Sequence, residues 1–163
     1  MRGSSGGEAD AFRDVPRPEG GDQAAGSRSA GSRSRTRIEF RVAGQAEPIS
    51  HFTDAVQAGE LLFVSGIVPV DGNGELVGGD DVVAQARAVF SNMGEILTAA
   101  GCTFADVVKV TVFLTDVDDR PLINPVRQEV FGESRPASTL VEVSALVIPG
   151  ARIEVEAIAS IPS

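Results

Sequence analysis

Apolar and polar residues alternate in several short segments of this chain, and a period of two residues predicts half-buried β-strands. The alternating segments are residues 37–43, 108–114 and 152–160, and residues 137–143 are predicted to form a further strand. Residues 61–64, LLFV, form a continuous apolar run instead, which indicates a buried strand. The next segment, VPVDGNG at residues 68–74, is rich in turn-forming residues and predicts a hairpin.

A spacing of three and four residues replaces this alternation in the middle of the chain and predicts an amphipathic helix. Its apolar stripe consists of Val82, Ala86, Val89, Phe90, Met93, Leu97 and Ala100. Asp80 or Asp81 can accept a hydrogen bond from a free backbone N–H at the start of this helix, and Gly101 is placed to end it. A second helix is predicted from Pro121, which follows two aspartates, to about Phe131.

Two amphipathic helices among these strands predict an α/β protein of the two-layer α+β type, with a mixed sheet and both helices packed on one face. This chain then leaves the other face of the sheet uncovered. The side chains expected on that face are Lys109, Thr111, Phe113, Ser138, Leu140 and Glu154. A face of this mixed composition fits either burial against another subunit or ordinary contact with solvent.

Composition divides the chain into a tail and one domain. Residues 1–36 are rich in Gly, Ser, Arg and Ala, and they offer too little apolar surface to form a core. We therefore predict a disordered tail over residues 1–36 and a single folded domain over residues 37–163.

The charge of the domain argues against nucleic acid as a partner. The whole chain has a formal net charge of -9. Residues 37–163 hold eight cationic side chains against 18 acidic ones, an excess of negative charge that repels a phosphate backbone. No basic stripe interleaved with aromatic side chains, of the kind that binds single strands, is visible in the sequence.

Further sequence features bear on the compartment and on bound groups. The chain has no apolar run of about 18 residues and no apolar leader, so we expect no membrane span and no secretion signal. Its one cysteine, Cys102, cannot form an intrachain disulfide, which fits a reducing compartment and predicts a cytoplasmic protein. Because CxxC, HExxH and glycine-rich phosphate-binding motifs are missing, we expect neither a metal nor a cofactor.

Several blocks of the sequence carry a family resemblance. Residues 135–143, RPASTLVEV, are followed after a short loop by residues 153–159, IEVEAIA. This pair of segments resembles the C-terminal signature of the RidA/YjgF family, the reactive-intermediate deaminases. Residues 61–69, 99–113 and 116–124 resemble further blocks of the same family in the same order. Several separated blocks in one order are more specific than any single motif.

The resemblance implies a chorismate-mutase-like fold and a homotrimer with three clefts at its subunit interfaces. It also implies that the protein hydrolyses a small, reactive enamine or imine to a ketone and ammonia. The family's older label as a ribonuclease does not fit the acidic charge of this domain.

The resemblance also places family site residues on positions of this chain. Asn124 matches the asparagine of the cleft, and Glu154 matches the acidic residue that handles water. Ser65 and Gly66 match the end of a strand that the family places at the substrate. Phe52 stands where the family usually has a tyrosine, so its hydroxyl is lost.

Two positions on the predicted strand at residues 137–143 differ from the family pattern. Ser138 stands where deaminating members carry an arginine that binds the substrate carboxylate, and Leu140 stands where a cysteine is usual. A guanidinium grips a carboxylate with two charge-assisted hydrogen bonds, whereas a serine offers one neutral donor, a loss of about 2 kcal/mol or more. Either the substrate lacks a carboxylate, or another cation binds it, or the cleft only binds its ligand.

Three cations are candidates to replace that arginine: Arg135, Arg152 and Lys109. Arg135 lies three residues before Ser138, so in an extended strand its side chain points to the opposite face.

Imine hydrolysis needs a positioned water and a group that moves protons. One carboxylate with a raised pKa in a dry cleft can take a proton from the water and return it to the leaving amine. Glu154 is our candidate for this group, and the alternative is a solvated carboxylate on an outer strand face. His51, the single histidine, either shuttles protons in place of the missing tyrosine hydroxyl or is an ordinary histidine of a surface loop.

Two functional hypotheses follow from these residues. In the first, the protein is an enzyme, a trimeric C–N hydrolase in which Glu154 positions water. In the second, the same clefts bind a small metabolite without turnover, or the trimer is a scaffold. Glu154 and Asn124 favour the first hypothesis, and Ser138 favours the second.

Overall fold

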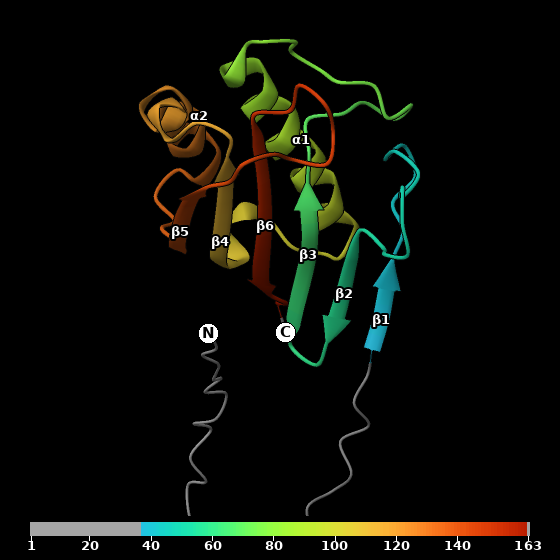
Figure 1. Ribbon diagram of the computed structural model, residues 1–163. Coiled ribbons are helices and arrows are strands. Elements are labelled where there is room, and N and C mark those ends of the chain that lie inside the picture. The colour runs from blue at the N-terminus through green and yellow to red at the C-terminus, as the bar shows by residue number, and fades with distance from the viewer. Residues whose placement is uncertain (1–36, 163) are drawn as a thin grey trace, which may run out of the picture. The chain divides into compact units, whose positions relative to one another are not determined.

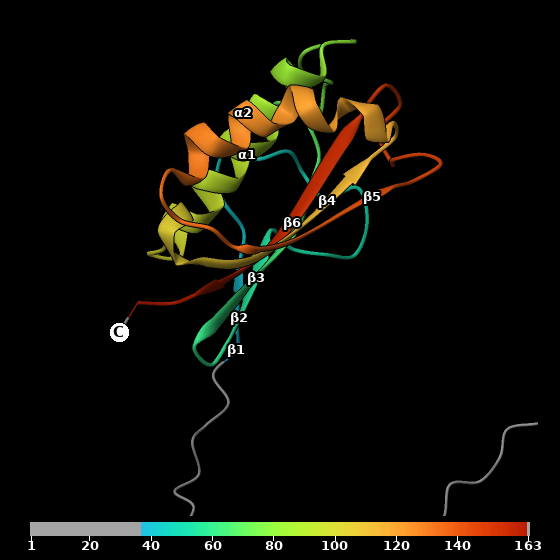
Figure 2. The same cartoon turned by 90° about the vertical axis from the view of Figure 1, so that its left-hand side faces the viewer.

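A mixed sheet and two helices form the two layers of the domain (Figures 1 and 2). The computed structural model describes residues 37–162, and the predicted tail at residues 1–36 lies outside the described residues. In chain order the elements are β1 (Arg37–Phe40), β2 (Ala55–Ala58), β3 (Leu61–Ile67), α1 (Val82–Ala99), β4 (Val107–Leu114), α2 (Arg120–Phe131), β5 (Ala137–Glu142) and β6 (Ile153–Ser160). Short 3₁₀ turns precede β4 and α2, at Phe104–Asp106 and Val117–Asp119.

The strands are arranged in the order β1-β2-β3-β6-β4-β5. Only β4 and β5 pair in parallel, with α2 as the connection between them, and the other neighbouring strands are antiparallel. Figure 2 shows α1 and α2 on the same side of the sheet. The prediction of a two-layer α+β domain with both helices on one face is therefore confirmed.

The core lies between the helices and the side chains of one sheet face. Six of the seven residues in the predicted helical stripe are buried, and Ala100, the seventh, is half-buried. Asp81 rather than Asp80 begins α1, because its carboxylate accepts hydrogen bonds from the backbone N–H groups of Val83 and Ala84. Gly101 has a φ of 74°, in the left-handed region that ends helices.

Strand β6 lies between β3 and β4 and has the alternation that the sequence predicts. The side chains of one of its faces are buried against the helices: Ile153, Val155, Ala157 and Ala159. On the other face, Glu154 and Ile158 are half-buried and Glu156 is exposed.

Three sequence predictions of strands need correction. Strand β2, AVQA, was not expected because four residues of mixed polarity give no clear period. Strand β1 ends at Phe40 rather than at residue 43. The hairpin predicted at residues 68–74 is reduced to an isolated bridge between Val70 and Leu76.

The prediction that Ser138 and Leu140 lie on the uncovered face is wrong. In the register of β4 with β5, Ser138 pairs with Val110 and Leu140 pairs with Val112, and both partners point into the core. Paired residues of neighbouring strands point to the same side of a sheet, so Ser138 and Leu140 face the helices. The sequence ASTLVE has small or apolar residues on both faces, and only its pairing decides which face is inward.

The face of the sheet opposite the helices carries apolar side chains that this chain leaves uncovered. Phe63 of β3 is 42% exposed and Val141 of β5 is 40% exposed. The register places both on the same side as Glu154 and Phe113. A sheet face with large apolar residues of this exposure is typical of a surface that contacts another protein chain.

A buried polar group joins the first turn of α1 to the start of β6. The Gln85 side chain is fully buried, and its amide donates to the carbonyls of Gly79, at 2.6 Å, and Gly150, at 2.9 Å. Its Oε1 accepts from the backbone N–H of Arg152 at 2.7 Å. Backbone groups of three separate residues therefore depend on this one buried side chain.

We predict that Gln85→Leu lowers the free energy of unfolding by about 2–4 kcal/mol, because it leaves backbone donors and acceptors unsatisfied inside the protein. Urea unfolding followed by circular dichroism measures the change. Ser91→Ala, an exposed site on the same helix, is the control and stays within about 0.5 kcal/mol of the wild type. An equally stable Gln85→Leu variant would contradict this assignment.

Candidate functional site

A cavity of about 460 Å³ lies where the loop between β1 and β2 meets the end of β3 and the loop before β6. Most of its wall is apolar and includes Ile49, Phe52, Ile67, Val147 and Ile148. Its polar wall includes the carboxylate residue Glu154 and the irregular part of β3 at Ser65 and Gly66. This combination of an apolar wall with a few polar groups is typical of small-molecule sites.

Glu154 is the acidic residue of this cavity whose pKa is perturbed. Its side chain is half-buried, and this burial raises its pKa above the ordinary value of 4.5, with a further contribution from the negative charge of Glu156. Ionisation of Glu154 therefore weakens folding as the pH rises through the raised pKa, because the folded chain holds this proton more tightly than the unfolded chain. A carboxyl group whose pKa is raised by burial in a cavity is suited to general acid–base chemistry.

Gly66 makes room for the Glu154 carboxylate. It lies in an irregular part of β3, where the register with β6 shifts between Val64 and Ile67. A Cβ atom on Gly66 would collide with Oε1 of Glu154 and would lie 3.0 Å from its Cδ. The carboxylate lies directly against the strand backbone, so a larger residue at position 66 would force the Glu154 side chain to move.

Two hydrogen bonds join Ser65 to the residues that immediately precede β2. Its backbone N–H donates to the carbonyl of Asp54 at 3.0 Å, and its hydroxyl donates to the carbonyl of Thr53 at 2.6 Å. The Ser65 hydroxyl therefore holds the cavity wall in place, and its oxygen can still accept hydrogen bonds.

Arg41 and Asp54 hold the loop that forms the outer wall. The buried Asp54 carboxylate accepts from Arg41 Nη1 and from the backbone N–H of Val42, both at 2.7 Å. Arg41 Nη2 donates to the carbonyl of Ala46 at 2.7 Å. Asp54 thus orders this loop, and within residues 37–162 it makes no hydrogen bond to His51.

The structure brings together four of the predicted site residues: Phe52, Ser65, Gly66 and Glu154 all line the cavity. His51, the neighbour of Phe52, is exposed and is not part of the cavity wall. Its predicted role as a proton shuttle stays a prediction.

The other three predicted residues lie elsewhere in the domain. Asn124 is exposed on α2, and Ser138 and Leu140 are on the edge strand β5. Their side of the sheet is the helix side, whereas Glu154 points to the uncovered side. One copy of the chain therefore holds two separate groups of candidate residues.

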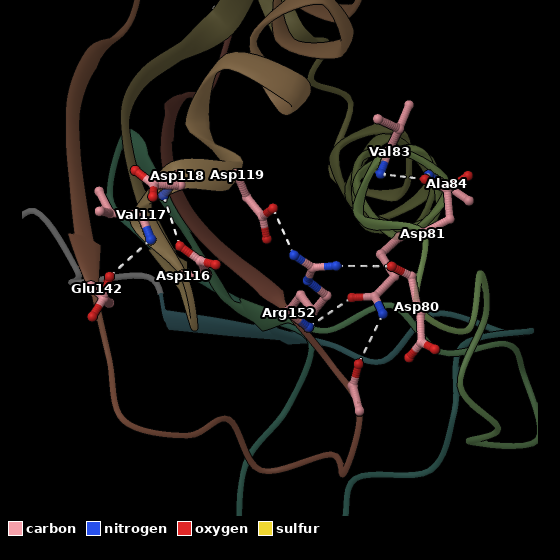
Figure 3. Close-up of polar contacts among 12 residues, drawn as sticks. Asp80, Asp81, Val83, Ala84, Asp116, Val117, Asp118, Asp119, Glu142 and Arg152 are labelled. Carbon is pink, nitrogen blue, oxygen red and sulfur yellow. Dashed lines mark hydrogen bonds and ion pairs between the residues drawn. The ribbon is translucent and has the colours of Figure 1, made fainter.

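Two of the three candidate replacement cations are engaged away from Ser138. Arg152 binds Asp119 through Nη2 at 2.7 Å and the carbonyl of Asp80 through Nη1 at 3.0 Å (Figure 3). Lys109 donates to the hydroxyl of Thr139 at 2.6 Å, on the uncovered side of the sheet.

Sequence reasoning missed the cation that does contact Ser138, which is Arg127. Its Nη2 donates to the Ser138 hydroxyl at 2.8 Å. The available signal was its place on α2, three residues after Asn124 and next to the buried Val126. Helical spacing sets Arg127 at the border of the buried face, but it does not reveal the strand opposite.

Other chemistry finds no support within residues 37–162. Cys102 is buried, and this burial raises the pKa of its thiol, which disfavours the reactive thiolate. No group of three His, Cys, Asp or Glu side chains in this range is arranged to hold a metal ion. Within the same range, no helix combines the length and apolar character that a membrane crossing demands.

We predict that Gly66→Ala lowers the pKa of Glu154 toward its ordinary value, because the added methyl group displaces the carboxylate from its half-buried position into water. Titration of the Glu154 side-chain carboxyl by ¹³C NMR measures the midpoint. Glu156→Gln is the control, which removes the like charge but keeps the burial, and so produces the smaller decrease. An unchanged midpoint in Gly66→Ala would show that the close approach does not set the pKa.

Comparison with known proteins assigns the family. The family model described as Endoribonuclease L-PSP matches residues 43–161. A RutC family protein of Pyrococcus horikoshii is 46% identical over 114 residues, which cover 69% of this chain and 89% of the relative. The 2-iminobutanoate/2-iminopropanoate deaminase of Mus musculus is 43% identical over 112 residues, which cover 68% of this chain and 82% of the relative.

A solved structure agrees with these sequence matches. RidA from an Antarctic Psychrobacter bacterium superposes with a TM-score of 0.71 and 34% sequence identity, over 76% of this chain and 99% of that protein. The predicted resemblance and the predicted fold are therefore confirmed, and this chain belongs to the Endoribonuclease L-PSP family, which is the RidA/YjgF family.

Proposed function

We propose that this protein is a deaminase that hydrolyses a small imine or enamine, at clefts that the subunits of a homotrimer share. The carrying observation is Glu154, a half-buried carboxylate with a raised pKa in a mostly apolar cavity. The deaminase name of the mouse relative supports the same class of reaction.

Glu154 has the properties that the proton transfers of this reaction require. The carboxylate accepts a proton from a water molecule as the water oxygen attacks the carbon of the C=N bond. The carboxylic acid returns this proton to the nitrogen, which gives a carbinolamine. The carboxylate then takes the carbinolamine hydroxyl proton and delivers it to the nitrogen as the C–N bond breaks, so that both protons of the water leave on ammonia and a ketone remains. An imine and one water are consumed, and no cofactor is needed for this balance.

The charge and the cavity both support a small metabolite rather than RNA as the substrate. The domain is strongly acidic, with 18 acidic side chains in residues 37–163, and the cavity wall is mostly apolar. In this proposal Phe52, Ser65 and Gly66 contact the substrate, and His51 stays a candidate for proton delivery from the loop. The free Cys102 supports the cytoplasm as the location.

Two observations support a shared cleft. Glu154 lies on one side of the sheet and Ser138 and Leu140 lie on the other, so a single copy does not bring them to one ligand. The uncovered sheet face also presents Phe63 and Val141 for burial. A neighbouring subunit packed on this face satisfies both conditions.

We predict that Glu154→Gln slows ammonia release by about 10²- to 10⁴-fold, because the amide neither accepts nor returns the proton. The assay follows ammonia from 2-iminobutanoate generated in the cuvette, above a blank without protein. Glu156→Gln is the matched control on the same strand and keeps activity close to that of the wild type. Equal rates for the wild type and Glu154→Gln would remove the catalytic role, and a wild-type rate equal to the blank would favour a binding protein.

We also predict that the protein is a trimer in solution, because the uncovered sheet face is otherwise left in water. Light scattering coupled to size-exclusion chromatography then gives three times the mass of one chain. Phe63→Lys places a charge in the proposed interface and shifts the mass toward that of the monomer. A wild-type protein that elutes as a monomer would contradict the shared cleft.

A further inference from the structure

Arg127 is a half-buried arginine whose charge has no acidic partner among residues 37–162. Its side chain lies at the border of the buried face of α2, and burial lowers its pKa from the ordinary value. Its Nε atom is closed off from solvent and finds no hydrogen-bond partner among residues 37–162. Charged groups removed from water are normally paired, so this environment leaves an unmet demand for an anion.

Most other arginines of the domain form ion pairs, whereas Arg127 forms none within residues 37–162. Four other arginines of the domain, Arg37, Arg41, Arg87 and Arg152, form ion pairs with carboxylates. In the described part of the chain no carboxylate forms an ion pair with Arg127, although acidic side chains greatly outnumber cations. Its one side-chain partner is the neutral hydroxyl of Ser138, at 2.8 Å.

The hydrogen bond from Arg127 to Ser138 places the guanidinium and the serine hydroxyl side by side, and both groups can donate to a ligand. The Ser138 oxygen accepts from Arg127, so its own hydroxyl hydrogen is free to donate to another group. Ser138 is exposed at the edge of the sheet, so a small molecule can approach this pair from outside. Together the two side chains offer one positive charge and one neutral donor, a combination that recognises a carboxylate.

We propose that Arg127, held by Ser138, is the carboxylate-binding group of this protein, so that the substrate is a small imine that carries a carboxylate. This inference rests on the proposed function for the identity of the substrate, but the anion site itself is defined by Arg127 and Ser138. The cation comes from α2 rather than from β5. Since the domain as a whole is acidic, a small anion binds only where a local cation outweighs the surrounding charge.

The same geometry determines which copy of Glu154 meets the bound molecule. Arg127 and Ser138 lie on the helix side of the sheet, and Glu154 of the same chain points to the uncovered side. A small molecule held by Arg127 therefore meets the Glu154 carboxylate of a second copy. Arg127 and Ser138 bind the carboxylate end, and the cavity of the neighbouring copy provides the water and the proton transfers.

The test compares two ligands that differ only in charge, 2-oxobutanoate and its neutral amide, 2-oxobutanamide, by isothermal titration calorimetry. The wild type binds the acid more tightly than the amide. Arg127→Met weakens binding of the acid by about 10- to 100-fold and leaves binding of the amide nearly unchanged. Arg120→Met, which removes an exposed arginine from the same helix, leaves both affinities at their wild-type values.

Two further variants separate anion binding from a structural role. Arg127→Lys keeps the charge without the planar fork and gives an intermediate affinity for the acid. Ser138→Arg in the Arg127→Met background returns a guanidinium to the site and restores the preference for the acid. A merely structural Arg127 would instead weaken both ligands equally when replaced, and this result would overturn the proposal.

The Glu154→Gln variant tests the anion site separately from the proposed deaminase activity. The variant loses ammonia release and retains the Arg127-dependent preference for the acid. If the wild type binds the acid through Arg127 but releases no ammonia, the anion site stands and the deaminase proposal fails. If the wild type is an active deaminase and Arg127→Met binds 2-oxobutanoate as tightly as the wild type, the anion site fails and the deaminase proposal stands. A wild type that does not bind 2-oxobutanoate also overturns the anion site.

Discussion

The register of β6 between β3 and β4 is the constraint on which the rest of the structure depends. It directs Ile153, Val155 and the two alanines into the core and leaves Glu154 on the other face. A shift by one residue would exchange the two sets, burying glutamates against the helices and exposing the apolar row. The burial of the apolar row therefore fixes the side on which the acid lies.

The cavity shows how the fold tolerates a carboxylate away from bulk water. Burial works against its charge, and the raised pKa of Glu154 records that cost. The irregular part of β3 at Gly66 leaves room for the Glu154 side chain, and the Asp54–Arg41 contact orders the loop that encloses it. The unfavourable burial of Glu154 is confined to this cavity because buried apolar contacts and the Gln85 network hold the surrounding elements in place.

Charge is distributed unevenly over the two faces of the sheet. On the uncovered side, Glu154 lies near the like charge of Glu156. On the helix side, Arg127 forms no ion pair with a carboxylate of residues 37–162 and donates to the Ser138 hydroxyl. Glu154 on one surface is suited to exchange a proton with a ligand, and Arg127 on the other surface is suited to bind an anion. The two groups are complementary. In the proposed function, association between copies places them around one ligand.

The sequence by itself determined what depends on short-range periodicity. The span of α1, the buried faces of β4 and β6, the two-layer class and the family blocks are all properties of consecutive residues. Tertiary structure alone decided the existence of β2, the inward direction of Ser138 and Leu140, and the contact of Arg127 with Ser138. These features depend on which distant segments become neighbours and in which register, and the strands β2 and β5 carry too little alternation to specify that locally.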